Sequence, residues 1–384
     1  MPTIDVSKYR IPGQLIEDLL GERGWTQRVL AQVLDVDETG LNKIVAGKRP
    51  LGPDMALALE ELFGVAADDF LRLQRDFDLA QARLTVRPDP DRATRAQLIG
   101  GLPVAEMAKR GWLSIDKDKL RDAALVQAAL AKFFGVDSIS EIEVLPHAAK
   151  KTEVVGDVTP TQLAWLYRVR EIANDMLAPR YSPAAVRDAV GRLRELLLAA
   201  EEARKVPRIL AESGIRFLLV ESLHGAKTDG VCFWLNDHSP VVAMTLRYDR
   251  IDNFWFVLRH ELEHVLRRDG IGAMMLDAEL EGERAGVGPG VSVQERAANA
   301  AAAEFCVPQA ALDRFVARKS PLFAERDFLG FARTLQIHPG LVAGQLQRRT
   351  SRYERFRNHL VKIRSIVAPG ARVDGWGDIA VVGE

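Results

Sequence analysis

Three observations predict an α+β fold that is predominantly helical. The chain has 384 residues, more than one hydrophobic core usually spans, so several domains are expected. Apolar residues recur at mixed three- and four-residue spacings through most of the chain, which predicts amphipathic helices. Between residues 215 and 246 the pattern changes to three short apolar runs separated by turn signals, which predicts a small sheet.

The composition predicts a globular, cytoplasmic protein with no membrane partner. Hydrophobic residues make up 47% and charged residues 27% of the chain, and no apolar run approaches the length of a membrane span. The first residues lack the features of a signal peptide, and Cys232 and Cys306 do not suggest a disulfide framework. The net charge is −1, so any nucleic-acid binding must be local.

Residues 11–79 predict a bundle of short helices. Thr26 and Asp37 have the character of N-cap residues, whereas Gly24 and Gly47 end helical segments. The helices that begin at Thr26 and Asp37 are separated by a short turn and form a helix-turn-helix. In this motif the start of the later helix enters the major groove of double-stranded DNA.

The predicted DNA contacts lie on and just after this later helix. Residues 10–62 hold six Lys and Arg against nine Asp and Glu, so a bundle used only for protein contacts is the alternative. The base and backbone contacts are expected from Glu38, Thr39, Asn42 and Lys43, with Lys48 and Arg49 on phosphate.

This region resembles the HigA-type branch of the XRE helix-turn-helix repressors. The matching features are Ile11-Pro12-Gly13, Leu30-Ala31, Gly47-Lys48-Arg49-Pro50 and Leu73-Gln74-Arg75-Asp76-Phe77-Asp78. The resemblance implies binding to an operator in double-stranded DNA, and such repressors commonly form homodimers.

Two segments without obvious chemistry follow. Residues 80–100 are polar and interrupted by proline, which predicts a linker. Residues 101–205 predict a helical spacer or sensor segment. Its longest helices are expected near residues 119–134, 161–176 and 183–203.

The second half of the chain begins with the predicted strands at 215–220, 230–235 and 240–246, with turn signals at Asp229-Gly230 and Asn236-Asp237. A helix then carries His260-Glu261-Leu262-Glu263-His264. Asp252 is its expected N-cap, and Asp269-Gly270 its expected end.

The spacing of the two histidines indicates a metal site. Residues four apart lie on one face of a helix, so His260 and His264 can bind one ion. Glu261 lies about 100° around the helix and is placed to act as a base. The alternative is a helix with two surface histidines. A catalytic zinc site normally has three protein ligands and a water, so a third ligand is required.

An alanine-rich helix at 294–308 offers the third ligand. Glu295 and Asn299 share a face, which predicts a carboxylate ligand with a hydrogen-bonding neighbour one turn later. Glu304 is the competing ligand, although it lies half a turn out of phase with Glu295. Between the two helices, residues 279–290 predict a glycine-rich, acidic loop.

His260-Glu261-Leu262-Glu263-His264, followed by Glu295-x-x-Ala298-Asn299 and residues 302–308, resembles the ImmA/IrrE family of metallopeptidases. The resemblance implies a zincin-like domain at 206–310, followed by a helical extension at 311–384. It also implies Zn²⁺ bound by His260, His264 and Glu295, with Glu261 as general base. Position 263 is Glu where the family usually has Gly, and a surface ion pair of Glu263 with Arg259 or Arg267 is expected.

Two functional hypotheses follow. In the first, the chain is a DNA-binding zinc endopeptidase that cleaves a partner repressor or antitoxin-type protein. In the second, it is a HigA-type transcriptional regulator or antitoxin whose metallopeptidase-like domain senses a signal or binds a protein with little catalysis.

Overall fold

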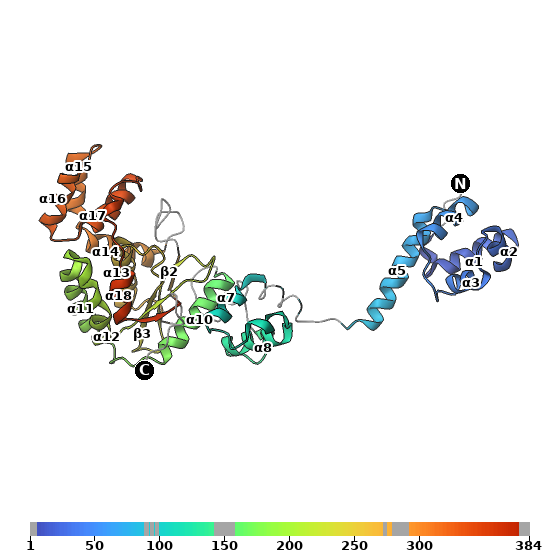
Figure 1. Ribbon diagram of the computed structural model, residues 1–384, viewed down its shortest axis with the longest axis horizontal. Helices are drawn as coiled ribbons and strands as arrows, with labels where there is room; N and C mark the ends of the chain where they lie inside the picture. The colour runs from blue at the N-terminus through green and yellow to red at the C-terminus, as the bar shows by residue number, and fades with distance from the viewer. Residues whose placement is uncertain are drawn as a thin grey trace. The chain divides into compact units, whose positions relative to one another are not determined.

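The computed structural model contains two compact units, Met1–Pro90 and Asp91–Glu384. The chain is predominantly helical and has one small mixed sheet, as the sequence predicts (Figure 1). Among the described residues, no helix is long and apolar enough to cross a membrane. The structure describes residues 6–87, 92, 96, 100–141, 158–271, 275–278 and 292–375.

The first unit is a helical bundle around one apolar core, which includes Leu15, Leu30, Leu41, Leu59 and Phe70. Its elements are a 3₁₀ turn η1 (Val6–Lys8) and the helices α1 (Pro12–Arg23), α2 (Gln27–Val33), α3 (Glu38–Val45), α4 (Pro53–Phe63) and α5 (Ala67–Thr85).

Side-chain caps define the helix-turn-helix at α2 and α3. Thr26 Oγ1 accepts a hydrogen bond from Val29 N at 3.2 Å, and Asp37 Oδ2 accepts one from Gly40 N at 2.6 Å. The predicted N-caps are therefore confirmed. In contrast, the start predicted for the linker at residue 80 is too early, because α5 continues to Thr85. No glycine or proline interrupts the chain between residues 80 and 87.

The second unit is built on a five-stranded sheet with the order β4-β2-β3-β1-β5. β1 pairs in parallel with β3 and β5, whereas β2 pairs antiparallel with β3 and β4. The strands are β1 (Arg216–Val220), β2 (Thr228–Trp234), β3 (Pro240–Met244), β4 (Met275–Ala278) and β5 (Arg372–Asp374).

Three of these strands are predicted by the sequence, but the turn expected at Asp229-Gly230 is wrong. Both residues lie inside β2, where the pairing with β4 is irregular between Thr228 and Gly230. The C-terminal extension at 311–384 contains helices, as expected, but also the unpredicted strand β5, which pairs with β1 from a position more than 150 residues later in the chain. Such long-range pairing leaves little local signal in a three-residue strand.

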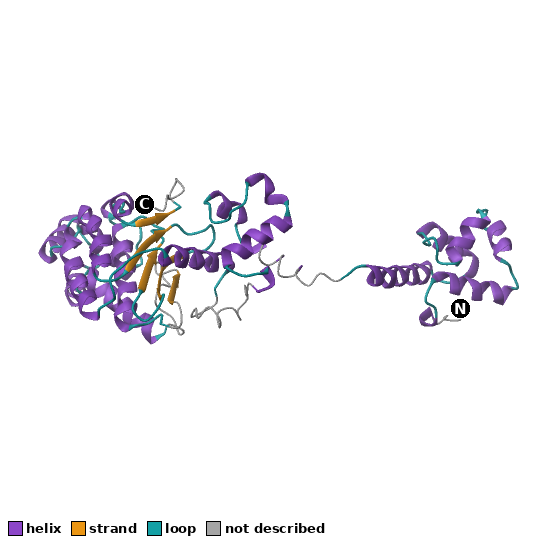
Figure 2. Cartoon of the chain, turned by 90° about the horizontal axis from the view of Figure 1, so that it is seen from below, coloured by secondary structure: helices purple, strands orange, loops and turns teal. Residues whose placement is uncertain are grey.

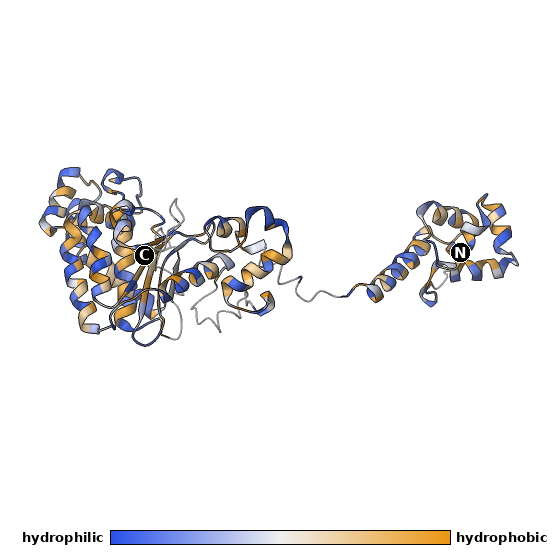
Figure 3. Cartoon of the chain, turned by 60° about the horizontal axis from the view of Figure 1, so that its bottom comes forward, coloured by the Kyte–Doolittle hydropathy of each residue, from blue (hydrophilic) through white to orange (hydrophobic). Residues whose placement is uncertain are grey.

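Helices cover both faces of the sheet (Figure 2). Successive residues of β1 alternate between two cores: Phe217 and Leu219 enter one, and Leu218 and Val220 enter the other. This double burial explains why the strands are continuous apolar runs and do not alternate with polar residues. Figure 3 shows the resulting apolar colour along the sheet and on the inner sides of the surrounding helices.

One face is covered by helices of the segment predicted as a spacer or sensor. Leu163, Trp165 and Val169 are buried in the same core as the sheet residues Val231 and Val241. These helices form one of the two layers that pack on the sheet; they are α7 (Val104–Lys109), η2 (Lys117–Arg121), α8 (Ala123–Phe134), η3 (Ile139–Glu141) and α10 (Pro160–Asn174). The rest of the predicted segment, residues 181–203, is buried in the core on the opposite face.

The opposite face carries the motif helix α13 (Ile251–Arg267) and the remaining helices. The helix expected at 183–203 ends at Glu195, and the carbonyl of Leu197 beyond it accepts a hydrogen bond from His338 N at 2.7 Å. The other elements are α11 (Pro183–Glu195), η4 (Leu196–Leu198), η5 (Ala200–Lys205), α12 (Val206–Glu212), α14 (Val293–Cys306), α15 (Gln309–Lys319), α16 (Glu325–Leu335), α17 (Pro339–Thr350), η6 (Arg357–His359), α18 (Arg364–Val367) and η7 (Ala368–Gly370).

The predicted ends of α13 are displaced. Arg250, not Asp252, is the N-cap, and the buried Asp252 forms an ion pair with Arg250. At the other end the helix stops at Arg267, because Arg268 adopts a left-handed conformation with φ 61°.

A buried polar network attaches β5 to the helical layer formed by residues 104–174. Asp374 is 1% exposed, and its Oδ2 accepts hydrogen bonds from Trp112 Nε1 at 2.9 Å and Arg168 Nε at 2.6 Å. The backbone of Asp374 also accepts a hydrogen bond from Glu221 N at 2.9 Å. A single carboxylate therefore connects the sheet edge with two separate parts of the helical layer.

We predict that Asp374→Ala lowers the free energy of unfolding by about 2–4 kcal/mol, because the buried Trp112 N–H loses its acceptor and Arg168, which keeps its ion pair with Glu171, loses the more buried of its two partners. Urea unfolding followed by tryptophan fluorescence measures the change. Glu212→Gln removes the exposed partner of Arg192 and Arg208 and serves as the control, with a much smaller effect expected. Equal effects of the two variants would contradict the prediction.

Candidate functional site

The structure brings His260, His264 and Glu295 together. Their ligand atoms all lie within 4.8 Å of one another. The two histidine Nε2 atoms are 3.1 Å apart. Glu295 Oε2 lies 3.3 Å from His260 Nε2, and Glu295 Oε1 lies 3.4 Å from His264 Nε2. Both histidines are fully buried, whereas the Glu295 side chain is 23% exposed, so solvent reaches the cluster at the glutamate.

Two helices hold these side chains. α13 packs against β2, β3 and α14, so the histidines lie inside the unit and not on a surface helix. α14 begins at the N-cap Ser292, whose Oγ accepts a hydrogen bond from Glu295 N at 3.1 Å. This cap fixes the first turn of α14 and with it the position of Glu295.

Glu261 lies against the sheet. Its side chain is fully buried, and a Cβ atom at Gly230 of β2 would overlap its carboxylate. Glycine is therefore required at position 230 if the carboxylate is to lie where it does. Sequence reasoning missed this role, although a glycine inside an apolar strand is a signal for close approach of another group.

A second carboxylate, which the sequence analysis treats only as a helix stop, contacts His264. Asp269 Oδ2 lies 3.1 Å from His264 Nδ1, on the side of the ring opposite the cluster. The left-handed turn at Arg268 folds the chain back, so that Asp269 N also donates a hydrogen bond to His264 O at 2.9 Å. The carbonyl of Asp269 accepts a hydrogen bond from Trp234 Nε1 at 2.9 Å, which ties this turn to β2.

The other predicted residues near the motif have different positions. Glu304 is exposed and accepts a hydrogen bond from Gln309 N at 2.8 Å, so it lies away from the cluster. Asn299 Oδ1 is buried and accepts no hydrogen bond from the described residues. Glu263 forms the expected ion pair with Arg259 at 2.8 Å, but the two side chains are only 19% and 12% exposed, so the pair is not a surface one. The loop predicted at 279–290 lies outside the described residues.

The predicted DNA-contacting residues are all on the surface of the first unit. α3 buries Leu41, Ile44 and Val45 in the core, which turns its opposite side outward. Basic and polar groups on one exposed helix, with two further cations just beyond it, suit a nucleic-acid backbone and base edges. The exposed residues are Glu38, Thr39, Asn42, Lys43, Lys48 and Arg49.

Comparisons with known proteins match part of the chain. A family model described as helix-turn-helix (HTH_3) matches residues 16–70. The chain is 31% identical over 75 residues to an uncharacterized HTH-type transcriptional regulator, YddM, of Escherichia coli strain K12, covering 20% of this chain and 80% of that protein. It is 35% identical over 72 residues to virulence-associated protein I of Dichelobacter nodosus, covering 18% of this chain and 67% of that protein.

The matched residues run from α1 into α5 and include both capped helices of the motif. The exposed side of α3 is part of the same match. Through residues 16–70, the chain belongs to the helix-turn-helix family HTH_3.

Proposed function

We propose that this protein is a DNA-binding regulator whose second unit is a zinc endopeptidase that cleaves a partner repressor or antitoxin-type protein. One observation supports the peptidase assignment: two different helices bring His260, His264 and Glu295 together at one point. The helix-turn-helix unit brings the peptidase to an operator, where its protein substrates are themselves bound to DNA.

The three side chains fit a zinc ion. Ligand atoms at about 2.0–2.2 Å from a tetrahedral ion lie roughly 3.3–3.6 Å from one another. The two histidine Nε2 atoms are 3.1 Å apart, and each lies near a different oxygen of Glu295, His260 at 3.3 Å from Oε2 and His264 at 3.4 Å from Oε1, so the carboxylate faces both rings. Two imidazoles and one carboxylate are a common donor set for catalytic zinc, and three protein ligands leave one position for water.

The residues around the cluster have complementary roles. Asp269 accepts a hydrogen bond from His264 Nδ1–H, so the lone pair of Nε2 faces the cluster. Bound zinc supplies an activated water and polarises the scissile carbonyl. Glu261 takes a proton from the attacking water and transfers it to the leaving amine. Because Gly230 has no side chain, the Glu261 carboxylate has room to lie against β2.

The first unit is a DNA-binding helix-turn-helix module. α3 enters the major groove, where Thr39, Asn42 and Lys43 reach base edges and nearby phosphates. Lys48 and Arg49 follow the helix and neutralise phosphate.

A second candidate is a HigA-type regulator or antitoxin in which the cluster has a structural or sensing role with little catalysis. The observation that favours it is the extent of the family match, residues 16–70, which supports DNA binding but does not reach the cluster. Metal content and the effect of Glu261 distinguish the two candidates.

For the metal, we predict that the purified wild-type chain binds one equivalent of Zn²⁺ and that His264→Ala abolishes this binding. Asp269→Ala should weaken zinc affinity by about 10–100-fold, because it removes the group that orients His264. Competition with a zinc chelator, monitored by elemental analysis, gives the affinities. Glu304→Gln, on the exposed side of α14, is the matched control and should bind zinc like wild type. A wild-type chain that binds no zinc would support the second candidate.

For catalysis, we predict that Glu261→Gln retains zinc and DNA binding but loses cleavage, since the amide cannot accept the proton. Labelling of new protein N-termini in cells that express the wild type, but not in cells that express the variant, measures the loss. Glu263→Gln, on the same helix but paired with Arg259, is the control and should cleave like wild type. If wild type and Glu261→Gln produce the same N-termini, the peptidase hypothesis fails.

For DNA, we predict that the double variant Lys48→Ala, Arg49→Ala binds mixed-sequence duplex with a weaker dependence on salt. The slope of log K against log salt concentration should become less steep by about 1.8, roughly 0.9 for each lost phosphate contact. Asn42→Ala should leave the slope unchanged and alter the sequences selected from a randomised duplex library. Fluorescence anisotropy over a salt series provides the slopes. Arg208→Ala, at an 86% exposed position in the second unit, is the control. An unchanged slope in the double variant would contradict the phosphate assignment.

A further inference from the structure

The last helices of the second unit carry a concentration of positive charge. Residues 309–364 hold twelve Lys and Arg against four Asp and Glu, a net charge of +8 in a chain whose total is −1. Ten of the twelve cations are arginine, whose planar group can bind a phosphate through two hydrogen bonds. Figure 1 shows α15, α16 and α17, which carry much of this charge, next to one another at one end of the second unit.

The acidic residues of the same segment neutralise few of these cations. Three of the four form ion pairs within the segment, and one of these pairs is with a histidine: Asp313–Arg349, Glu325–His359 and Asp327–Lys319. Seven exposed cations form no ion pair with any residue that the structure describes: Arg314, Arg318, Arg326, Arg333, Arg352, Arg357 and Lys362. Most of the positive charge is therefore open to an external anion.

Part of this charge forms one surface, the basic patch of Arg314, Arg318, Lys319 and Arg349. The first three line a groove of about 710 Å³ between α15 and α16. Arg314 and Arg318 are four residues apart on one side of α15, and Arg318 Nε donates a hydrogen bond to Arg314 O at 3.3 Å. The end of α17 joins them, because Arg349 pairs with Asp313, the residue beside Arg314.

Packing fixes the helix that carries the basic patch. Phe315, between the two arginines, is 2% exposed, and its ring stacks on that of Phe331 of α16 with the centroids 4.4 Å apart. The backbone positions of Arg314 and Arg318 are therefore set before an anion binds, which lowers the entropy cost of binding.

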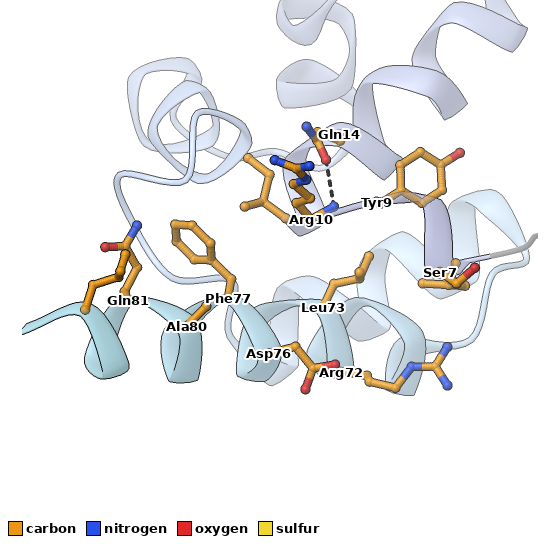
Figure 4. Close-up of a pocket in the computed structure, with 13 residues that line it drawn as sticks. Ser7, Tyr9, Arg10, Gln14, Arg72, Leu73, Asp76, Phe77, Ala80 and Gln81 are labelled. Carbon is orange, nitrogen blue, oxygen red and sulfur yellow. Dashed lines mark hydrogen bonds between the residues drawn. The ribbon is translucent and has the colours of Figure 1, made fainter. Parts of the chain in front are cut away.

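A groove of the first unit lacks this charge. It has a volume of about 950 Å³ and lies between α5 and the start of the chain. Figure 4 shows Leu73 and Phe77 of α5 pointing into it. Of the two arginines that line it, Arg10 and Arg72, the second pairs with Asp69 at 2.9 Å. The groove beside α15 is thus the one suited to an anionic partner.

We propose that the basic patch binds the phosphate backbone of double-stranded DNA beside the site occupied by the helix-turn-helix. The first unit directs the chain to DNA, yet residues 10–62 hold six Lys and Arg against nine Asp and Glu. It therefore supplies little of the electrostatic term that dominates DNA affinity, and cations elsewhere in the chain can supply the rest. Because both units belong to one chain, the second contact is intramolecular and benefits from a high effective concentration.

An acidic protein is the alternative partner, and the distribution of the cations favours DNA. The exposed cations without an ion pair lie on α15, on α16 and after α17, so they extend well beyond one groove. A duplex carries one negative charge per about 1.7 Å of its axis and matches such an extended surface. Phosphate contacts carry no base information, so the basic patch should strengthen binding to all sequences alike and hold the second unit on the flanking duplex. This proposal does not depend on zinc or on peptidase activity.

The test measures binding of the full-length chain to a mixed-sequence duplex several helical turns long, by fluorescence anisotropy over a salt series. The double variant Arg314→Ala, Arg318→Ala should make the slope of log K against log salt concentration less steep by about 1.8, roughly 0.9 for each lost phosphate contact. Arg314→Lys with Arg318→Lys retains both charges and should retain the slope. Arg192→Ala with Arg208→Ala removes two exposed arginines elsewhere in the second unit, which pair with Glu212, and should not change it.

Two further measurements separate the basic patch from the first unit. Combined with Lys48→Ala and Arg49→Ala, the patch double variant should reduce the slope by the same further amount, because the two sets of contacts are independent. It should also select the same sequences as wild type from a randomised duplex library. A patch variant that lowers the slope when the Lys48, Arg49 variant does not would support the proposal and contradict only the phosphate assignment in the first unit. A patch variant with the wild-type slope would overturn the proposal and leave an acidic protein as the partner of the patch.

Discussion

Burial of the sheet on both faces is the constraint on which the second unit depends. Alternate residues of β1 enter two different cores, so each strand needs a helical layer on either side. The helices of residues 104–174 provide one layer, and α13 with its neighbours provides the other. Because apolar burial is the main favourable term in folding, removing either layer would expose a continuous apolar surface. The helices of residues 104–174 are thus part of the platform that supports the cluster of His260, His264 and Glu295.

The cluster itself depends on small backbone features of this platform. Gly230 allows β2 to pass close to Glu261, and the Ser292 cap begins α14 where Glu295 can face the histidines. The left-handed turn at Arg268 returns Asp269 to His264. None of these residues is part of the motif, yet each one holds a motif residue in position. Positioning by rigid elements and neighbouring hydrogen bonds is what a metal site requires.

The first unit is organised differently. Its interior is a single apolar core, and the predicted DNA-contacting residues are all on its surface. α2 and α3 begin at the predicted caps Thr26 and Asp37, and α1 ends at Gly24, so local signals describe these helices well. α5 differs, because its apolar residues continue beyond the core of the bundle: Leu73 is buried in that core, whereas Leu84, near the end of the helix, is 82% exposed.

The sequence by itself determined the helical bundle, three of the strands, the motif helix and the pairing of His260 with His264, because these follow from short-range periods and caps. Only the tertiary structure decided between Glu295 and Glu304, added Asp269 to His264, and placed Gly230 against Glu261. It also revealed β5, which is held by Trp112 and Arg168. These contacts join residues that are distant in the chain or separated by an unusual turn. Their geometry depends on how whole elements pack, which local patterns do not encode.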